Sequence, residues 1–446
     1  MKASIFLIAI SLLLRLLILG TYFFNQPDMI FKPDAPDNWE YHFLGKNLVE
    51  YHTFSSDSIP PLKPDAIRTP VYPLFIGILY TFFGDSPKTV IFVQALLGSA
   101  TVLIFFRLCQ LFLSVRMAFL AALLFAFEPF AILFTGFYMT ETLFTFFLCL
   151  SFYYLSKYFD SGSLANCLYS SLFLGLTALC RPIIQFYIPL IVVAIFYSPL
   201  LRQVRRKKRL VHAALYFGVC LLMIFAWSLR NQIEFGQFKL STIDEVNLSR
   251  YEIPKFRYYS GEISIDNEQR NTYSEYVNLV LKHPVYFVEL QAYYIYKYLF
   301  DLGRGYLFFP EVCDRYSLKN VTPKAGLLGL IKWDIFDCMR AINDVVLKRP
   351  GYKGLLVGSF FLGYLSYLLF LYLLFPIGII KAWKERNFCV LVLAATFAYG
   401  AAFSGSVAAV RFRLPFTFAL IGVAFYGLES LLHRCEIRQF SIKEDA

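Results

Sequence analysis

The segment 70–84 reads PVYPLFIGILYTFFG, and its length decides how the rest of the chain is threaded. It is as apolar as a membrane helix, but a helix needs about 20 such residues to cross the hydrocarbon core of a bilayer. Prolines lie near its start and a glycine closes it. We therefore expect an interfacial or re-entrant helix over 70–84 that does not cross the membrane.

The composition of the whole chain is that of a membrane protein. Of its 446 residues, 58% are hydrophobic and 16% are charged, and the mean hydropathy is +0.56. Soluble domains have about 45–50% apolar and about 25% charged residues. The formal net charge is +11, and basic residues gather in short segments between apolar runs. This distribution is typical of membrane topology rather than of nucleic-acid binding.

Ten apolar runs are candidates for transmembrane helices. The first carries Lys2 and lacks a convincing small-residue cleavage site, so we expect a retained helix and not a signal peptide. The predicted fold class is an all-α polytopic membrane protein with about ten transmembrane helices and extracytoplasmic juxtamembrane helices, forming a single membrane domain over 1–446. The predicted spans are 3–24, 88–113, 117–135, 139–158, 164–180, 183–200, 210–229, 354–380, 388–409 and 414–432.

Basic residues predict the orientation. The segment 201–209 (LRQVRRKKR) holds six basic residues and no acid, and the segment 381–386 and the tail from His433 are also basic-rich. Ten spans with both termini in the cytosol place all three inside, as the positive-inside rule requires. A crossing at 70–84 would put RRKKR outside.

Two polar regions then face the extracytoplasmic side. The first is an opening loop over 25–87, and the second is a large loop over 230–353. Within the second, 272–302 has apolar and aromatic residues near helical spacing, which predicts one or two amphipathic helices.

The opening loop contains a dense patch of acids and aromatics, because 34–54 reads DAPDNWEYHFLGKNLVEYHTF. Asp37 with Glu40 three residues later resembles a capping box, and apolar residues from Tyr41 onward fall on one helical face. We expect an amphipathic helix on the membrane surface. Asp37 either caps this helix or acts as a general base at the water–lipid boundary, and Asp34 and Glu40 are rival bases.

Arginines are predicted on the same side of the membrane. An arginine in or beside a membrane helix is costly and usually has a partner, and guanidinium is a natural bidentate partner of phosphate. Snorkelling at helix ends is the alternative for each of them. The candidates are Arg68, Arg230, Arg411 and Arg413, and Arg181 also approaches this face.

Two further features leave alternatives open. Glu141 lies at the start of the span predicted at 139–158. Either the helix dipole alone stabilises an acid at this position, or Glu141 is a second acid for substrate hydroxyls or a cation. The nine cysteines show no metal-ligand spacing. Cys313 and Cys338, both in the large loop, either form a disulfide or remain free thiols.

Five phrases, in order along the chain, resemble motifs of the GT-C glycosyltransferases. The stretch from Asp37 through Tyr41 to Asn47-Leu48 resembles the DxxxYxxxAxNL helix of that superfamily, with Gly45 in place of the usual alanine. The branch is similar to the family 39 protein mannosyltransferases, the aminoarabinose transferase of lipid A and the RgtA/B/C/D-like bacterial enzymes. The other phrases are Arg68-Thr-Pro-Val-Tyr-Pro (followed by Gln94 to Gly98), Thr140-Glu141, Trp227-Ser-Leu-Arg230-Asn231, and Arg411-Phe412-Arg413-Leu-Pro, in which Phe412 replaces the usual tyrosine.

The resemblance implies a helical bundle and a reaction. A sugar would pass from a polyprenyl-phosphate carrier to an acceptor with inversion, and the catalytic acid would lie in the first outer loop. By position Asp37 would be the base, with Asp34 as the alternative and Glu141 as a second acid. The phosphate of the donor would be bound by Arg68, Arg230, Arg411 and Arg413, and the substrate would be lined by Glu40, Tyr41, Tyr72 and Asn231.

Partners and location are expectations of the same kind. The acceptor would be a lipid, glycan or protein, and no nucleic acid is expected. We expect no metal site and no cofactor, although the clustered acids leave a divalent cation possible. The expected location is a bacterial inner membrane with a periplasmic active site. A lipid or polysaccharide flippase and an O-antigen-type polymerase are the alternative functions.

Overall fold

The structure is a computed structural model, and it describes residues 2–20, 36–201, 203–262, 273–303, 326–332, 352–405 and 409–444. Within these residues the regular structure is helical and no strand is found. The predicted all-α class is therefore confirmed. Asp34, Cys313 and Cys338 lie outside the described residues.

The helices fall into two compact units. The first unit comprises Met1–Ser241, Leu371–Phe397 and Leu414–Ala446. The second comprises Thr242–Phe370 and Ala398–Arg413. The expectation of a single membrane domain stays a prediction.

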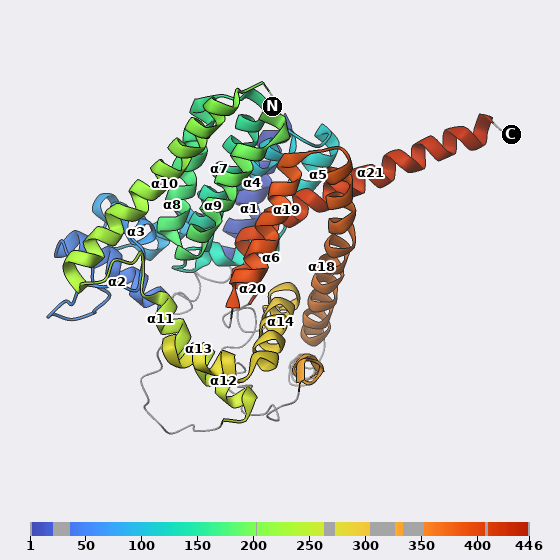
Figure 1. Cartoon of the computed structure of the whole chain (residues 1–446). Helices are drawn as coiled ribbons and strands as arrows, with labels where there is room; N and C mark the ends of the chain where they lie inside the picture. The colour runs from blue at the N-terminus through green and yellow to red at the C-terminus, as the bar shows by residue number, and fades with distance from the viewer. Residues whose placement is uncertain are drawn as a thin grey trace. The chain divides into compact units, whose positions relative to one another are not determined.

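The first unit is a bundle in which α1, α4, α7, α8 and α10 lie side by side (Figure 1). Each of these helices is predominantly apolar, so packing against its neighbours removes part of its surface from lipid. The elements of this unit are α1 (Lys2–Ile18), α2 (Pro36–Glu50), α3 (Val71–Phe83), α4 (Pro87–Cys109), α5 (Val115–Ala126), α6 (Pro129–Leu133), η3 (Phe134–Gly136), α7 (Glu141–Ser161), α8 (Leu164–Cys180), η4 (Pro182–Tyr187), α9 (Ile188–Tyr197), η5 (Pro199–Leu201), α10 (Arg206–Phe235), η9 (Leu414–Phe416) and α21 (Thr417–Glu444).

The second unit contains α11 (Ile243–Asn247), η6 (Leu248–Glu252), α12 (Ile253–Ser260), α13 (Tyr273–Lys282), α14 (Pro284–Phe300) and α20 (Val410–Arg413). The helices α12, α13 and α14 pack against one another. The predicted helices over 272–302 are thus confirmed as two, separated where Pro284 begins the second. Two long helices, α18 (Tyr352–Lys384) and α19 (Phe388–Phe403), contribute residues to both units.

Several helices are long and apolar enough to cross a membrane. Among the described residues, four helices meet this criterion, in the ranges Pro87–Cys109, Arg206–Phe235, Gly358–Lys384 and Val410–His433. A fifth candidate is a pair of helices, Val115–Ala126 and Pro129–Gly136, bent by 56°. The chain is thus a membrane protein by the length and composition of its helices, and the count of ten spans stays a prediction.

The bent pair corrects the straight span expected over 117–135. Proline at position 129 has no amide hydrogen to continue the ladder of α5, so the helix ends at Ala126 and a new one starts. The carboxylate of Glu128 accepts a hydrogen bond from the amide of Ala131 and caps the new helix.

The helix predicted at 70–84 is confirmed as α3, which ends before Gly84 at a φ of 74°. Its neighbour α2 begins at Pro36, so Asp37 lies in the first turn instead of at the N-cap position. The two helices pack closely at Gly45, where a Cβ atom would overlap the side chain of Ile76. This contact gives a physical reason for glycine at the position where the resembled motif has alanine.

Gln94 joins three segments of the first unit. It is fully buried on α4, and its side-chain oxygen accepts a hydrogen bond from the Tyr72 hydroxyl at 2.8 Å. Its amide nitrogen donates to the carbonyl oxygens of Thr135 at 3.0 Å and Phe137 at 2.9 Å. These hydrogen bonds of the buried Gln94 amide hold α3 and the segment before α7 against α4.

Candidate functional site

Three charged side chains predicted for the site meet between α2 and the loop before α3. The Arg68 guanidinium donates from Nη2 to Asp37 Oδ1 at 2.5 Å, and from Nε to Glu40 Oε2 at 2.7 Å. Asp37 and Glu40 are three residues apart on α2, so both carboxylates project from the same side of that helix. The Tyr41 ring lies under the guanidinium, 5.0 Å from its carbon to the ring centroid.

The charge of this cluster is −1, because one guanidinium serves two carboxylates. The Arg68 side chain is 11% exposed, against 21% for Asp37 and 35% for Glu40. Burial acts to lower the pKa of Arg68, but Tyr41, Asp37 and Glu40 together outweigh burial and raise that pKa above its ordinary value. Arg68 is therefore a permanent cation beside two carboxylates.

The backbone around Arg68 is held by the side chain of Asp65. The Asp65 carboxylate accepts hydrogen bonds from the amides of Ile67 and Arg68, both at 2.8 Å. Its other oxygen accepts from the Ser56 hydroxyl at 3.0 Å. The loop is thus folded around one carboxylate before Arg68 reaches α2, which reduces the freedom of the guanidinium.

A second ion pair lies close to the first in the fold. The Glu141 carboxylate is fully buried and lies 3.0 Å from Arg181 Nη1. Arg181 follows α8 directly and Glu141 begins α7, so the pair fastens these two helix ends. The hydroxyl of Thr69, next to Arg68, donates to the carbonyl oxygen of Cys180 at 2.9 Å.

Arg230 and Asn231 lie near the end of α10, and Arg230 binds the loop before α3 from another side. Arg230 Nη1 donates to the carbonyl oxygen of Asp65 at 2.6 Å and to Asn231 Oδ1 at 2.9 Å. Asn231 is buried and donates to the carbonyl oxygen of Lys239 at 2.8 Å. Arg230 therefore positions the loop that carries Arg68, and Asn231 holds Arg230 and the segment after α10. Direct contact of either residue with substrate remains a prediction.

Arg411 and Arg413 belong to the second unit. Arg413 is fully buried, and its guanidinium donates to the carbonyl oxygens of Tyr298 at 2.8 Å, Leu299 at 2.6 Å and Asp301 at 2.9 Å. These carbonyls are at the C-terminal end of α14, where a cation is favoured by the helix dipole. Arg411 is half-buried beside Phe412, with 5.7 Å from its guanidinium carbon to the ring centroid. Phosphate binding by either arginine stays a prediction.

Tyr72 is the predicted substrate-lining residue that lies deepest. Its side chain is fully buried, its hydroxyl bonds Gln94, and its ring meets Tyr41 edge to face with centroids 4.9 Å apart. Contact between Tyr72 and a substrate remains a prediction. Asp34, the alternative base, has no described position. Among the described residues no group of three or more His, Cys, Asp or Glu side chains is arranged to hold a metal ion.

Three residues that shape the site were missed from the sequence. Asp65 and Thr69 flank Arg68, and Asn47 donates to the carbonyl oxygens of Ser55 at 2.8 Å and Asp57 at 2.9 Å. Asn47 belongs to the motif over Asp37 to Leu48 that resembles the GT-C helix, so the sequence could have indicated its importance. Asp65 and Thr69 gave no signal of their own, because their partners are set by tertiary packing.

Taken by itself, the arrangement provides two carboxylates next to a fixed guanidinium. Nη1 of Arg68 donates to no group in the described part of the chain, so that edge of the guanidinium can receive an anion. A carboxylate and a cation in one cluster can accept a proton and stabilise a leaving anion in the same step.

Comparison with known proteins supports the resemblance seen in the motifs. The family model of dolichyl-phosphate-mannose-protein mannosyltransferase matches residues 65–228, which include Arg68, Glu141 and Arg181. No curated protein matches the sequence.

Solved structures of an archaeal oligosaccharyltransferase share the fold, and a third solved structure shows only a similarity. The archaeal oligosaccharyltransferase AglB from Archaeoglobus fulgidus, in complex with an inhibitory peptide and a dolichol-phosphate, is 13% identical with a TM-score of 0.55, over 99% of this chain and 52% of its own. Its apo form is 14% identical with a TM-score of 0.53, over 99% and 52%. ArnT from Cupriavidus metallidurans, bound to undecaprenyl phosphate, is 13% identical with a TM-score of 0.43, over 96% and 78%.

The chain spans about half the length of the oligosaccharyltransferase that it matches. The fold and the family match together confirm the predicted resemblance to the GT-C superfamily of membrane glycosyltransferases.

Proposed function

We propose that this chain, which has the fold of the GT-C glycosyltransferases, transfers a sugar from a polyprenyl-phosphate carrier to an acceptor hydroxyl. The observation that carries the proposal is the Asp37–Arg68–Glu40 cluster. In this cluster, the two sequence motifs that begin at Asp37 and at Arg68, both similar to GT-C motifs, are in direct contact. The family match to a dolichyl-phosphate-mannose-dependent transferase supports the class of donor.

In the proposed reaction, the acceptor oxygen attacks the anomeric carbon of the donor sugar from the face opposite the phosphate. The bond from that carbon to the phosphate oxygen breaks, which inverts the configuration, and the polyprenyl phosphate leaves with the electron pair. Asp37 takes the proton of the acceptor hydroxyl. Atoms and charge balance without a further reactant.

Arg68 has two tasks in this proposal. Its ion pair keeps Asp37 ionised, and a base must be ionised to receive a proton. Its Nη1 edge would donate to the leaving phosphate and stabilise the charge that develops there. Arg230 and Arg411 or Arg413 are proposed as further phosphate ligands, and Glu141 as a second acid.

The partners are proposed from chemistry. The A. fulgidus oligosaccharyltransferase was solved with a dolichol-phosphate and a peptide, so a phosphate-bearing lipid and an extended acceptor are both compatible with this fold. The acceptor class is left to experiment among lipid, glycan and protein. We place the chain in a bacterial inner membrane, with basic segments and both termini in the cytoplasm and the site in the periplasm.

The test uses membranes that contain the full-length chain or its Asp37→Asn variant. A panel of radiolabelled polyprenyl-phosphate sugars is added, and label is followed into lipid, glycan and protein fractions. We expect transfer by the wild type and a loss of about 10²-fold or more in the variant, the range that a missing general base produces. Glu50→Gln, an exposed acid at the far end of α2, is the matched control and should transfer normally.

The other outcomes are equally informative. Equal transfer by wild type and Asp37→Asn would move the base to Asp34 or Glu40. No transfer from any donor by a folded wild type would end the transferase proposal and favour a flippase, to be examined by lipid flux. Label transferred as whole oligosaccharides would favour a polymerase.

We propose that the reaction needs no metal ion, because arginine can meet the charge on the leaving phosphate. Transfer is measured in excess chelator and after adding back single divalent cations. Retained transfer supports the proposal, while loss that one metal restores would replace it with a metal-assisted reaction.

A further inference from the structure

One arginine of the first unit is buried in the helical bundle and takes no part in the proposed reaction. Arg15 lies in the apolar run of α1 and is 1% exposed. A charged residue inside a membrane helix is costly enough that a specific compensating group is expected. Its Nη1 donates to the backbone oxygen of Ser11 at 3.2 Å and to the Ser11 hydroxyl. Its Nε finds no acceptor in the described part of the chain.

Room for this guanidinium is made by a glycine. A Cβ atom at Gly98 of α4 would lie 2.5 Å from Arg15 Nε and 3.1 Å from its Cζ. Any side chain at this position would therefore displace the guanidinium. Gly98 is the last residue of the segment from Gln94 to Gly98, which follows the second motif similar to the GT-C glycosyltransferases. The local sequence did not suggest that this glycine makes room for an arginine.

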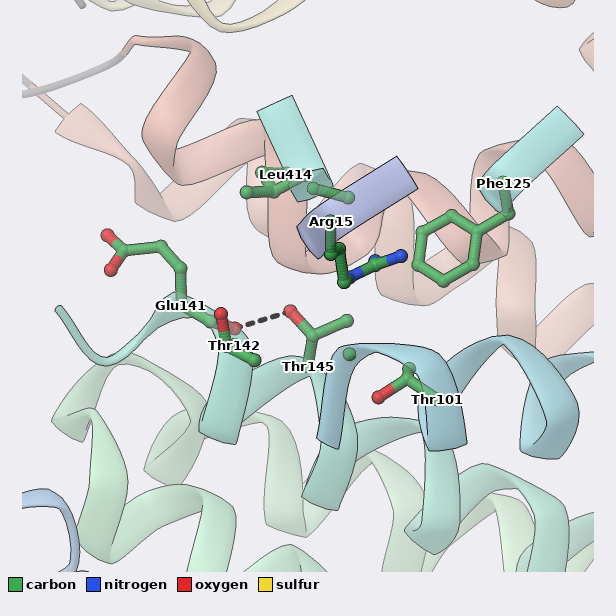
Figure 2. A pocket seen from close by; sticks show the side chains of 9 residues that line it. Arg15, Thr101, Phe125, Glu141, Thr142, Thr145 and Leu414 are labelled. Atoms are coloured by element: carbon green, nitrogen blue, oxygen red, sulfur yellow. Dashed lines mark hydrogen bonds between the residues drawn. The ribbon is translucent and has the colours of Figure 1, made fainter. Parts of the chain in front are cut away.

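A small cavity adjoins Arg15. Its volume is about 20 Å³, and its lining includes Thr101, Phe125, Ala131, Thr145 and Leu414. Figure 2 shows the guanidinium directed towards Phe125, while the Glu141 carboxylate points the other way. This volume suffices for about one water molecule and is too small for a phosphate group.

The donors and acceptors around the cavity select its occupant. The Thr101 hydroxyl donates to the carbonyl oxygen of Leu97 at 2.8 Å, and the Thr145 hydroxyl donates to that of Glu141 at 2.6 Å (Figure 2). The hydrogens of these two hydroxyls are thus already used, so their oxygens offer lone pairs. Arg15 offers N–H groups. A water molecule can serve both sides, whereas a chloride ion would face the lone pairs of both threonines.

The charge near Arg15 points the same way. Glu128 is 2% exposed and interacts electrostatically with Arg15. Its carboxylate is held by the amide of Ala131, which itself lines the cavity. The positive charge of Arg15 therefore has a negative counterpart already, and a further anion would be left without compensation.

We propose that the cavity beside Arg15 is a binding site for a single water molecule, which solvates the Arg15 guanidinium, while Glu128 at the bend between α5 and α6 supplies the opposite charge. The water and the opposite charge together offset the burial of the guanidinium, and the Glu128 carboxylate caps the helix that starts at Pro129. Glu141 also lines the cavity, but its carboxylate points away from Arg15 (Figure 2), and the oxidation and melting experiments below do not measure transfer, so each proposal can fail without the other.

Water in the cavity is tested on the full-length wild type in detergent. Radiolysis of ordered internal water oxidises the side chains beside it, and the products are read by mass spectrometry. We expect oxidation of Phe125 and Leu414, which are 2% and 3% exposed, and none of Phe418, which is fully buried and does not line the cavity. Phe125 and Leu414 as unreactive as Phe418 would overturn the water site.

The charge pair is tested by a double-mutant cycle on the melting midpoint. Arg15→Met and Glu128→Gln each remove one charge, and Gln keeps an acceptor for the Ala131 amide. Each single change should lower the midpoint by about 5 °C or more, and the double variant should lose clearly less than the sum. Strictly additive losses would exclude a coupled pair.

Two matched comparisons remain usable if Arg15→Met does not fold. Thr101→Val should lower the midpoint more than Thr177→Val, because both hydroxyls bond a carbonyl four residues back but only Thr101 lines the cavity. Gly98→Ala should lower it, whereas Gly218→Ala, with nothing within 4 Å of the added carbon, should leave it unchanged or raise it. Equal effects within both pairs would contradict the site.

Discussion

The hydroxyl of Thr69 donates a hydrogen bond of 2.9 Å to the carbonyl oxygen of Cys180, across 111 positions of sequence. Thr69 follows Arg68 and Cys180 precedes Arg181, so this bond joins the backbone segments of the two ion pairs of the candidate site. This contact therefore holds the loop before α3, which carries Arg68, against the end of α8, which Arg181 follows.

Thr69→Val tests that link. Valine keeps the shape of threonine but leaves the Cys180 carbonyl without its donor, which should cost about 1 kcal/mol of unfolding free energy. Because Arg68 would be less firmly held, we expect sugar transfer to fall more than this loss of stability explains. Thr81→Val, which removes only a hydroxyl bonded within α3, is the control and should transfer normally. Identical transfer by both variants would separate Thr69 from the site.

Arg68→Lys tests the fork of the guanidinium. Lysine keeps the charge but cannot donate from two directions to Asp37 and Glu40 and still meet a phosphate. We expect transfer to fall by about 10²-fold, the scale seen when one donor to a developing anion is removed. The control is Arg107→Lys, at an exposed position on α4. Full activity of Arg68→Lys would show that charge alone suffices.

Arg411 and Arg413 can be told apart by two different measurements. Arg413 donates to three carbonyl oxygens at the end of α14, so Arg413→Met should destabilise the protein by about 3 kcal/mol, seen as a lower melting midpoint. Arg411→Gln should leave the midpoint in place and weaken binding of the polyprenyl-phosphate donor. An unchanged midpoint for Arg413→Met, together with weaker donor binding, would instead assign Arg413 to the phosphate.

His42 predicts how stability depends on pH. It is buried on α2 with Nδ1 2.8 Å from the Tyr80 hydroxyl and 3.8 Å from Asp85 Oδ1. Burial lowers the pKa of His42, and the nearby charge of Lys46 lowers it further. The carboxylates of Asp85 and Glu50 raise the pKa but do not outweigh burial. The folded state therefore binds this proton less readily than the unfolded state does.

The sign follows from that difference. Stability from neutral His42 is fully present above the ordinary histidine pKa of about 6.5 and is lost as pH falls towards the lower folded value. The melting midpoint of the wild type should drop between pH 7.5 and 5.5, and His42→Gln should show a smaller drop. His52→Asn, at an exposed position, should behave as the wild type does. Parallel pH curves for wild type and His42→Gln would remove His42 as the cause.

The sequence by itself determined the helical class, the approximate place of most helices and the short α3, because apolar run length and helix-breaking residues act locally. It also selected Asp37, Glu40 and Arg68 as candidates through short phrases. It went wrong where a local signal was ambiguous. The run 117–135 hid the break at Pro129, and Asp37 lies one position inside its helix.

Only the tertiary structure decided which charges meet. Arg68 lies 31 positions from Asp37 in sequence, and Arg413 reaches carbonyls more than 100 positions away. Nothing in a local pattern specifies such pairs, because an arginine in an apolar run must find some partner and packing decides which one. The same holds for Arg15, since the space it occupies exists only because Gly98 of another helix has no side chain.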